Sequence, residues 1–279
     1  HPFLNNTLVW NKKENKNRNL ITLLCNIRKT KYDLVITLQR FFSSGLLTAF
    51  SGAKITAGFD KNPLSCFFTI KCKHQIGSKG EKYLHEVERN QSLISSLTDC
   101  NASKPRLYPS ERDYSKTKAY TTCTYICVAP ASLWYTKQYP IEKWCDFLSK
   151  VPTNINIYLL GGPSDKALCD NIANSLPNHN TVNFAGQLSL LESAALMKYA
   201  TMNYVCDSSP MHLCSSVDAP VTAIFCSTIP EFGFGPLSGN SAIVQSTKEL
   251  ACRPCGIHGH KECPNGSFEC ANSIDINEL

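Results

Sequence analysis

The chain has 279 residues, of which 43% are hydrophobic and 18% are charged, so it is long enough for two domains with an ordinary apolar core. No run of about 18 apolar residues is present, which excludes the usual kind of membrane-spanning helix. The net charge of +6 is unevenly spread: there are 20 Lys/Arg against 9 Asp/Glu through Lys118, and 8 against 13 from Ala119 onward. The basic half predicts an anionic partner, such as nucleic acid, an anionic membrane surface or a phosphorylated lipid.

The first half of the chain predicts few regular elements. Apolar runs indicate strands at 33–38 and 54–59, with a short helix at 42–49 between them and a longer helix at 80–97. Residues 101–118 are polar and contain two prolines, so we expect a linker there. The predicted domains are therefore residues 1–118 and 119–279.

The second half alternates strands with helices. Strands are expected at 122–128, 155–160, 181–184, 202–206 and 221–225, and helices at 141–150, from Ser164 or Asp165 to 176, at 190–200 and at 211–217. Ser189 and Glu192 form an S-x-x-E capping box for the third of these helices. This alternation predicts an α/β fold with a doubly wound parallel sheet, whose ligands bind beyond the carboxyl ends of the strands.

Two strand ends carry side chains suited to an anionic ligand. Asp207 and His212 flank a turn of small residues that leads from a strand into a helix, where free backbone N–H groups and the helix dipole favour phosphate. Lys137 follows the strand at 122–128, with Pro140 at the first turn of the next helix. The alternatives are a capping Asp207, a core His212 and a solvated Lys137.

The chain contains 15 cysteines, an odd number that cannot pair completely. Cys25, Cys127, Cys206 and Cys226 stand alone in apolar segments, where we expect buried free thiols typical of a reducing cytosol. The tail from 252 differs, because its cysteines have the spacing C-x2-C-x7-C-x6-C. These four thiols could hold a structural zinc ion or remain free or partly oxidised; the four are Cys252, Cys255, Cys263 and Cys270.

Taken in order, the motifs of this chain resemble those of glycosyltransferase family 9, the ADP-heptose:lipopolysaccharide heptosyltransferases, with most similarity to the heptosyltransferase II type. The matching segments are Y-D-L-V-I-T-L-Q (32–39), G-A-K-I-T-A-G-F (52–59), S-L-W-Y-T-K-Q-Y-P (132–140), L-L-G-G-P (159–163), F-A-G-Q-L-S-L-L-E (184–192), D-S-S-P-M-H (207–212) and the tail C-R-P-C…C…C.

The resemblance implies two facing Rossmann-like domains of the GT-B type, with the nucleotide-sugar in the second domain. It implies an inverting transfer of heptose from ADP-heptose, without a redox cofactor or an essential metal. Lys137 would neutralise the pyrophosphate, His212 would help to hold it, and Leu188 would lie near the adenine. The implied donor-binding residues are Ser132, Thr136, Lys137, Gly162, Leu188, Asp207, Ser208, Ser209, Met211 and His212.

The implied acceptor is a phosphorylated Kdo–lipid A core, which would explain the basic first half. Arg40 is the expected acceptor contact, with an exposed charge at a strand end as the alternative. The resemblance also implies that the protein is cytoplasmic and peripheral to the inner membrane. It implies no nucleic-acid partner.

Three departures from the family pattern are visible. The first is that nothing before Tyr32 matches the family's opening strand and Gly-Asp turn, whose Asp is the proposed base, so we expect an incomplete N-terminal domain and name no catalytic residue. The others are Ser209, which replaces a glycine and could narrow the phosphate approach or force a less favourable backbone angle, and an end at Leu279 before the family's last helix.

Two other functional classes stay open at this point. One is a catalytically inactive nucleotide-sugar-binding fragment or homologue, which the missing Gly-Asp turn favours. The other is a zinc-bearing nucleic-acid binder, which the basic half and the tail cysteines favour. No stripe of aromatic residues alternates with the basic ones, as single-strand binders require, so the nucleic-acid class is the weaker of the two.

Overall fold

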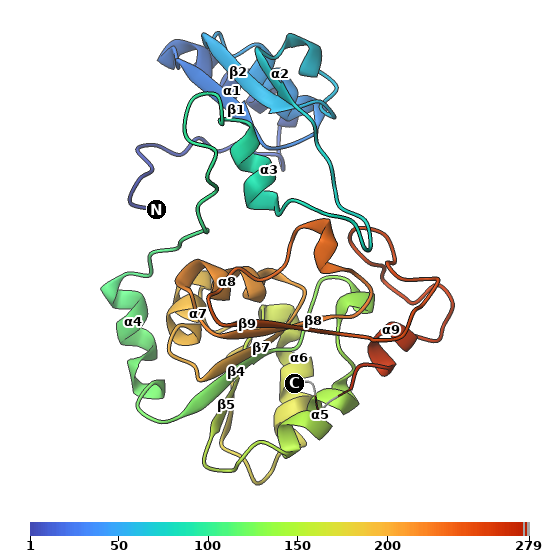
Figure 1. Cartoon of the computed structure of the whole chain (residues 1–279). Coiled ribbons are helices and arrows are strands. Elements are labelled where there is room, and N and C mark those ends of the chain that lie inside the picture. Colours follow the sequence, from blue (N-terminus) through green and yellow to red (C-terminus); the bar gives the residue numbers. More distant parts are fainter. Residues whose placement is uncertain (276, 278–279) are drawn as a thin grey trace. The chain divides into compact units, whose positions relative to one another are not determined.

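The computed structural model describes residues 1–275 and 277, and it divides into two compact units (Figure 1). Unit 1 comprises residues 1–77 and 82–103, and unit 2 comprises residues 78–81 and those from Lys104 onward. The main division therefore precedes the boundary expected after residue 118. Within the described residues, no helix is long and apolar enough to cross a membrane.

Unit 1 is a small α/β unit with a parallel sheet in the order β1-β2-β3. Its strands are β1 (Leu34–Thr37), β2 (Ile55–Phe59) and β3 (Ile70–Cys72), and its helices are α1 (Lys16–Thr30), α2 (Phe42–Ala49) and α3 (Glu86–Ser92). The predicted strands at 33–38 and 54–59 and the helix at 42–49 are confirmed. Neither α1 nor β3 was predicted.

The helix predicted at 80–97 is wrong over most of its length, because only Glu86–Ser92 is helical. His85 has an extended backbone and caps the helix: its side chain accepts from the Val87 N–H, and Glu88 accepts from the His85 N–H. This reciprocal cap marks the start of α3 at a residue that propensity alone did not single out.

Unit 2 contains a six-stranded, entirely parallel sheet in the order β6-β5-β4-β7-β8-β9. Its strands are β4 (Tyr125–Ala129), β5 (Asn156–Leu159), β6 (Thr181–Asn183), β7 (Met202–Cys206), β8 (Val221–Phe225) and β9 (Ser241–Gln245). Its helices are α4 (Glu111–Thr117), α5 (Ile141–Ser149), α6 (Lys166–Asn174), α7 (Leu190–Met197), α8 (Ser209–Val217) and α9 (Glu269–Asn272). The chain runs outward from β4 to β6 and then from β7 to β9, so the strand order reverses between β4 and β7. The predicted doubly wound sheet is confirmed, although β9 was missed.

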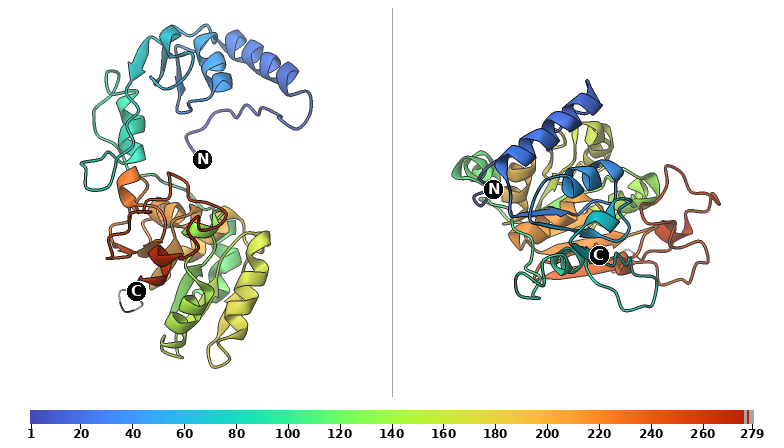
Figure 2. Two further views of the ribbon diagram at one scale, coloured as in Figure 1. Left: turned by 90° about the vertical axis from the view of Figure 1, so that its right-hand side faces the viewer. Right: turned by 90° about the horizontal axis from the view of Figure 1, so that it is seen from above.

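Helices cover both faces of this sheet (Figure 1, Figure 2). Trp144 and Leu148 of α5 and Ile172 of α6 pack in one core cluster, which Ala271 of α9 completes. A second cluster on the other face includes Met197 of α7, among other apolar side chains. Because both faces are covered, β4 and β8 are buried at all five positions rather than at alternate ones, and the buried residues of β8 include Thr222.

The linker predicted at 101–118 is wrong for its second half, which forms α4 and belongs to unit 2. Ser110 caps this helix by accepting from the Asp113 N–H, and the Asp113 carboxylate accepts from the Ser110 N–H. The S-x-x-D pattern was therefore a local helix signal within a polar, proline-containing stretch.

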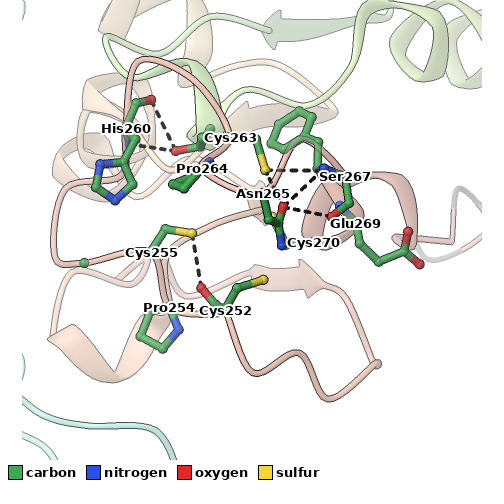
Figure 3. A pocket seen from close by; sticks show the side chains of 13 residues that line it. Cys252, Pro254, Cys255, His260, Cys263, Pro264, Asn265, Ser267, Glu269 and Cys270 are labelled. Atoms are coloured by element: carbon green, nitrogen blue, oxygen red, sulfur yellow. Dashed lines mark hydrogen bonds between the residues drawn. The ribbon is translucent and has the colours of Figure 1, made fainter.

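Residues 252–270, hereafter the cysteine segment, form loops that end in the short helix α9. Cys252, Cys255, Cys263 and Cys270 line a common pocket of about 370 Å³ (Figure 3). All four are free thiols, and within residues 1–275 and 277 no group of three or more His, Cys, Asp or Glu side chains is arranged to hold a metal ion. The zinc alternative therefore gains no support.

The expectation of buried free thiols in the body of the chain is confirmed for Cys127, Cys206 and Cys226. It is wrong for Cys25, which is exposed on α1, a helix without any buried residue.

Candidate functional site

A cavity of about 680 Å³ in unit 2 opens at the carboxyl edge of the sheet. Residues after β4, β5, β6 and β7 line it, so it spans the point where the strand order reverses, and this is where doubly wound sheets bind their ligands. Among the predicted donor residues, those that line the cavity are Ser132, Gly162, Leu188, Ser208 and Ser209.

Backbone forms one wall of the cavity. The Gly186 N–H donates to the Gly161 carbonyl at 2.9 Å, which joins the loops after β5 and β6. Gly186 has a φ of +76°, and a Cβ there would lie 2.9 Å from Pro163 Cα, so only glycine fits without strain. The Gly162 N–H donates to Asp165 Oδ2 at 2.7 Å. These bonds bring the two loops close enough to form a continuous surface.

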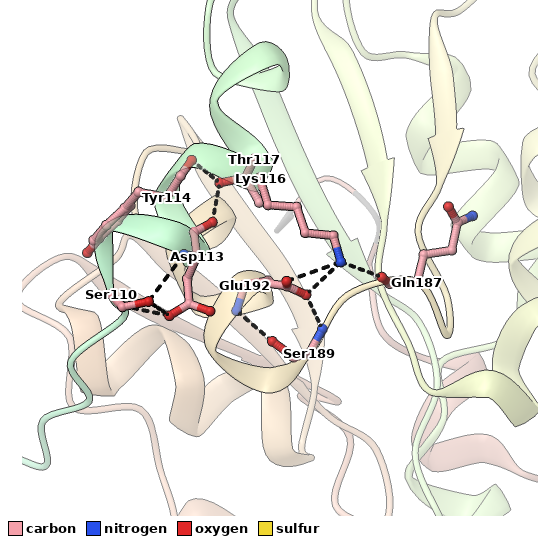
Figure 4. A network of polar contacts seen from close by, with 8 residues as sticks. All are labelled: Ser110, Asp113, Tyr114, Lys116, Thr117, Gln187, Ser189 and Glu192. Atoms are coloured by element: carbon pink, nitrogen blue, oxygen red, sulfur yellow. Dashed lines mark hydrogen bonds and ion pairs between the residues drawn. The ribbon is translucent and has the colours of Figure 1, made fainter.

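The Ser189 capping box predicted from the sequence is confirmed, and it holds the cavity rim after β6 (Figure 4). The Ser189 N–H donates to Glu192 Oε2 at 2.7 Å, and the Glu192 N–H donates to Ser189 Oγ at 3.2 Å. Lys116 of α4 joins this network through ion-pair contact with Glu192 at 3.1 Å. The Ser189 backbone and Lys116 together lower the pKa of the Glu192 carboxyl.

The amino end of α8 reaches the cavity. Ser208 is the N-cap residue in an extended conformation, and its Oγ donates to the Ala131 carbonyl at 3.3 Å, which ties the loops after β7 and β4 together. Ser209 is the first helical residue, and its φ is not positive. The less favourable backbone angle expected where a serine replaces glycine therefore does not arise. The start of a helix provides a favourable environment for an anionic group.

Lys137 and Asp207 form an ion pair beside the cavity. Lys137 Nζ lies 2.7 Å from Asp207 Oδ2, and the two side chains are only 15% and 8% exposed. Thr228, which follows β8, donates its hydroxyl to the same Asp207 oxygen at 2.6 Å. Asp207 directly precedes Ser208 of the cavity, so the structure brings the two predicted strand-end motifs together.

Two predicted donor residues have buried side chains. Thr136 is 1% exposed, and its hydroxyl is engaged by Ser227 and by the backbone of His260. Met211 is fully buried within the α7–α8 core cluster. Neither side chain lines the cavity, so contacts of these two side chains with a donor gain no support from this arrangement.

His212 is exposed in the first turns of α8, outside the set of residues that line the cavity. Arg40 is exposed after β1 in unit 1, where its charge lowers the pKa of His74, secondary to the effect of burial. The roles assigned to His212 and Arg40 stay predictions.

The residues of this region that sequence reasoning missed include Thr228 as a partner of Asp207, and Leu133 and Asp165 as lining side chains. All three follow strand ends, so the rule that located Lys137 and Asp207 could have located them too. Leu133 is 89% exposed, so its side chain is accessible at the cavity.

A switch-point cavity with a helix amino end and a nearby lysine defines a Rossmann-like site suited to a phosphorylated ligand. Residues 21–266 match the model of glycosyltransferase family 9 (heptosyltransferase), and the chain belongs to this family.

Two curated relatives are lipopolysaccharide heptosyltransferases. The chain is 25% identical to lipopolysaccharide heptosyltransferase 3 of Escherichia coli K12 over 229 residues, which is 76% of this chain and 64% of that protein. It is also 25% identical to lipopolysaccharide heptosyltransferase 1 of Pseudomonas aeruginosa over 243 residues, 82% of this chain and 63% of that protein. The chain thus spans slightly less than two thirds of the length of these relatives.

Solved structures show the same fold. E. coli ADP-heptose LPS heptosyltransferase II superposes with a TM-score of 0.71 at 18% identity, covering 92% of this chain and 80% of that one. E. coli heptosyltransferase WaaC with ADP superposes with a TM-score of 0.61 at 18% identity, covering 83% and 72%. The predicted fold class, α/β with parallel sheets of the GT-B type, is confirmed.

Proposed function

We propose that this chain is a glycosyltransferase that moves a heptose from ADP-heptose to the inner core of lipopolysaccharide, with inversion at the anomeric carbon. The observation that carries the proposal is the Lys137–Asp207 pair beside the switch-point cavity, in a chain of family 9. The relatives named as lipopolysaccharide heptosyltransferases support the donor and acceptor classes.

In this proposal the cavity holds the nucleotide. The apolar side chains of Leu133 and Leu188 line it and suit the faces of an adenine ring. The diphosphate lies at the start of α8, within reach of Lys137 and His212. Lys137 then exchanges part of its contact with Asp207 for the phosphate, while Asp207 keeps the ammonium group oriented.

The chemistry requires one bond to form and one to break. An acceptor hydroxyl attacks the anomeric carbon, the bond from that carbon to the diphosphate oxygen breaks, and ADP leaves with the electron pair. Lys137 and the N–H groups at the start of α8 stabilise the charge that develops on the diphosphate. A base takes the hydroxyl proton, and we assign no residue of this chain to that step.

We further propose that unit 1 binds the acceptor, a phosphorylated Kdo–lipid A core, at the cytoplasmic face of the inner membrane. Unit 1 itself, residues 1–77 and 82–103, contains 14 Lys/Arg against 6 Asp/Glu, which favours such an anionic partner, and exposed Arg40 is the proposed contact. Co-sedimentation with vesicles containing anionic lipid tests this, and binding that Arg40→Ala leaves unchanged would contradict the assignment of Arg40.

A catalytically inactive nucleotide-sugar-binding homologue is the second candidate. Asp165 is the one carboxylate among the described residues that line the cavity, and its oxygens already accept from the Gly162 N–H and the Ser164 hydroxyl. The cavity therefore offers no uncommitted carboxylate in the described part of the chain. This candidate predicts ADP binding without turnover.

Calorimetric titration of ADP into the wild type, Lys137→Ala and Asp207→Ala proteins tests the proposal. We expect saturable binding that both substitutions weaken by about tenfold or more, since Lys137→Ala removes the cation at the diphosphate position and Asp207→Ala removes the carboxylate that orients this cation. A folded wild-type protein that does not bind ADP would refute the transferase and the inactive homologue together. Turnover of ADP-heptose with a lipid A core acceptor then separates these two.

A further inference from the structure

The cysteine segment returns to the carboxyl edge of the unit 2 sheet and contacts the loops that carry Lys137 and Thr228. These loops are residues 134–138, after β4, and residues 226–229, after β8. His260 lies 124 residues after Thr136 in the chain. The sequence motifs therefore do not by themselves link the tail to the donor site.

His260 holds Thr136 by its backbone and side chain. The Thr136 N–H donates to the His260 carbonyl at 3.1 Å, and the His260 N–H donates to Thr136 Oγ1 at 2.8 Å. Thr136 Oγ1 also accepts from the Ser227 hydroxyl at 3.0 Å. The residue next to Lys137 is therefore fixed by the tail on one side and by the β8 loop on the other.

Gly259 packs directly against Lys137. Its φ is +77°, and a Cβ there would lie 2.9 Å from Thr136 Oγ1, 3.1 Å from Lys137 Cγ and 3.2 Å from Ser227 Oγ. Such distances are too short for a methyl group, so any larger residue must push the Lys137 stem or the Thr136 hydroxyl away. The aliphatic part of the Lys137 side chain packs against the backbone of Gly259, which carries no side chain.

Arg253 and Cys255 hold the loop after β8, which carries Thr228. The Cys255 N–H donates to the Ser227 carbonyl at 2.9 Å, and the Arg253 guanidinium donates to the Thr228 carbonyl at 2.8 Å. Thr228 is the residue whose hydroxyl binds Asp207. Burial lowers the pKa of the Arg253 guanidinium, and the group gains hydrogen bonds to Phe225 and Gln245 in compensation.

A stacked pair of aromatic rings adds a further contact. The rings of Tyr135 and Phe268 lie 5.1 Å apart at 27°. Tyr135 is 49% exposed and Phe268 is 9% exposed, so the tail provides the buried partner and the Lys137 loop provides the outer one. Tyr135 immediately precedes Thr136 and Lys137.

We propose that the cysteine segment is a clamp that positions Lys137 for the donor diphosphate, with Gly259 as the positioning residue. The inference rests on the proposed function for the identity of the ligand. It goes beyond that function by assigning the tail a role in donor affinity: the tail binds no donor atom itself, but it sets where the Lys137 ammonium lies relative to the start of α8.

Two glycines of the same segment provide a matched test. Gly256→Ala and Gly259→Ala both place a methyl group at positive φ, +66° and +77°, but a Cβ at Gly256 meets nothing within 4 Å. We expect Gly259→Ala to weaken ADP binding about tenfold relative to Gly256→Ala. The reason is that a small displacement of the Lys137 ammonium group greatly weakens its contact with the diphosphate. In turnover assays, the KM for the ADP-sugar rises and the KM for the acceptor does not change.

A second pair avoids the backbone. Tyr135→Ala removes the ring that stacks on Phe268, whereas Tyr135→Phe keeps it; since Tyr135 is half-exposed, both variants should fold. We expect weaker ADP binding for Tyr135→Ala and unchanged binding for Tyr135→Phe. Melting curves confirm that each variant is folded at the titration temperature.

The outcomes distinguish the two proposals. If the wild type binds ADP and the two glycine variants bind it equally, the clamp is refuted and the proposed function stands. If Gly259→Ala does not fold, the Tyr135 pair decides, and equal binding by its two variants refutes the clamp. If the folded wild type does not bind ADP, the proposed function fails and the clamp fails with it.

Discussion

Lys137, in the loop after β4, and Asp207, directly after the adjacent strand β7, form an ion pair of 2.7 Å that is largely shielded from solvent. Each was identified from a separate segment of sequence, and each alone had an ordinary structural explanation. Their pairing at the switch point supports the shared role that we propose for them, because a shielded lysine held by a carboxylate is oriented before an anionic ligand arrives.

The first prediction concerns this pair. Lys137→Met leaves the Asp207 carboxylate without its cation, so we expect a loss of unfolding free energy on the order of 3 kcal/mol. Lys166→Met serves as the control: it breaks an exposed pair with Asp170 and should cost less than about 1 kcal/mol. Adding Asp207→Asn to Lys137→Met should recover part of the loss, and a strictly additive double mutant in urea unfolding would contradict the coupling.

The second prediction concerns the cavity wall. Gly186→Ala places a methyl group at a φ of +76° and against Pro163, so we expect a loss of at least about 1–2 kcal/mol from the backbone conformation alone. ADP binding should weaken as the loops after β5 and β6 separate. Gly256→Ala, at a similar φ but in open space, should retain wild-type ADP affinity. Equal affinities in calorimetry would contradict this view of the wall.

The third prediction is a pH dependence of stability. The pKa of the Glu192 carboxyl is lowered from its ordinary value of 4.5 by the Ser189 backbone and by Lys116. Its stabilising effect is therefore present above pH 4.5 and is lost as the pH falls through the folded-state pKa. Glu192→Gln should melt below the wild type at pH 7, and the gap should close toward pH 3. A gap that is constant with pH, or one matched by exposed Glu249→Gln, would exclude this role.

The fourth prediction concerns thiol reactivity. Burial raises the pKa of the Cys206 thiol to about 12, and it also raises that of Cys226, so both should resist iodoacetamide at pH 8 while the protein is folded. Exposed Cys66 and Cys123 should react first. Mass spectrometry after timed alkylation measures the order, and early modification of Cys206 in folded protein would contradict the described packing.

The fifth prediction concerns metal removal. Because Lys137 and the start of α8 can balance the diphosphate charge, we expect ADP affinity to be the same in EDTA and in added Mg²⁺. The Lys137→Ala variant is the informative control, since rescue of its binding by Mg²⁺ would indicate that the lysine occupies the position of a cation. A requirement of the wild type for metal would contradict the assigned role of Lys137.

Local signals account for much of what the sequence determined. Largely apolar runs predicted β4, β5, β7 and β8, because strands covered on both faces bury residues on both sides. The Ser189 box set the start of α7, since its bonds join residues three apart. The same kind of signal at Ser110 was overlooked within a proline-containing stretch, so the second half of the expected linker is a helix.

Tertiary structure decided which of the motif residues face the cavity. Thr136 and Met211 belong to the motifs but have buried side chains, because each lies on the inner side of a turn or helix whose orientation depends on packing. The contacts of Gly259 with Lys137 and of Arg253 with Thr228 join segments far apart in the chain. Composition and spacing carry no information about such pairs, since the fold alone brings the tail back to the sheet edge.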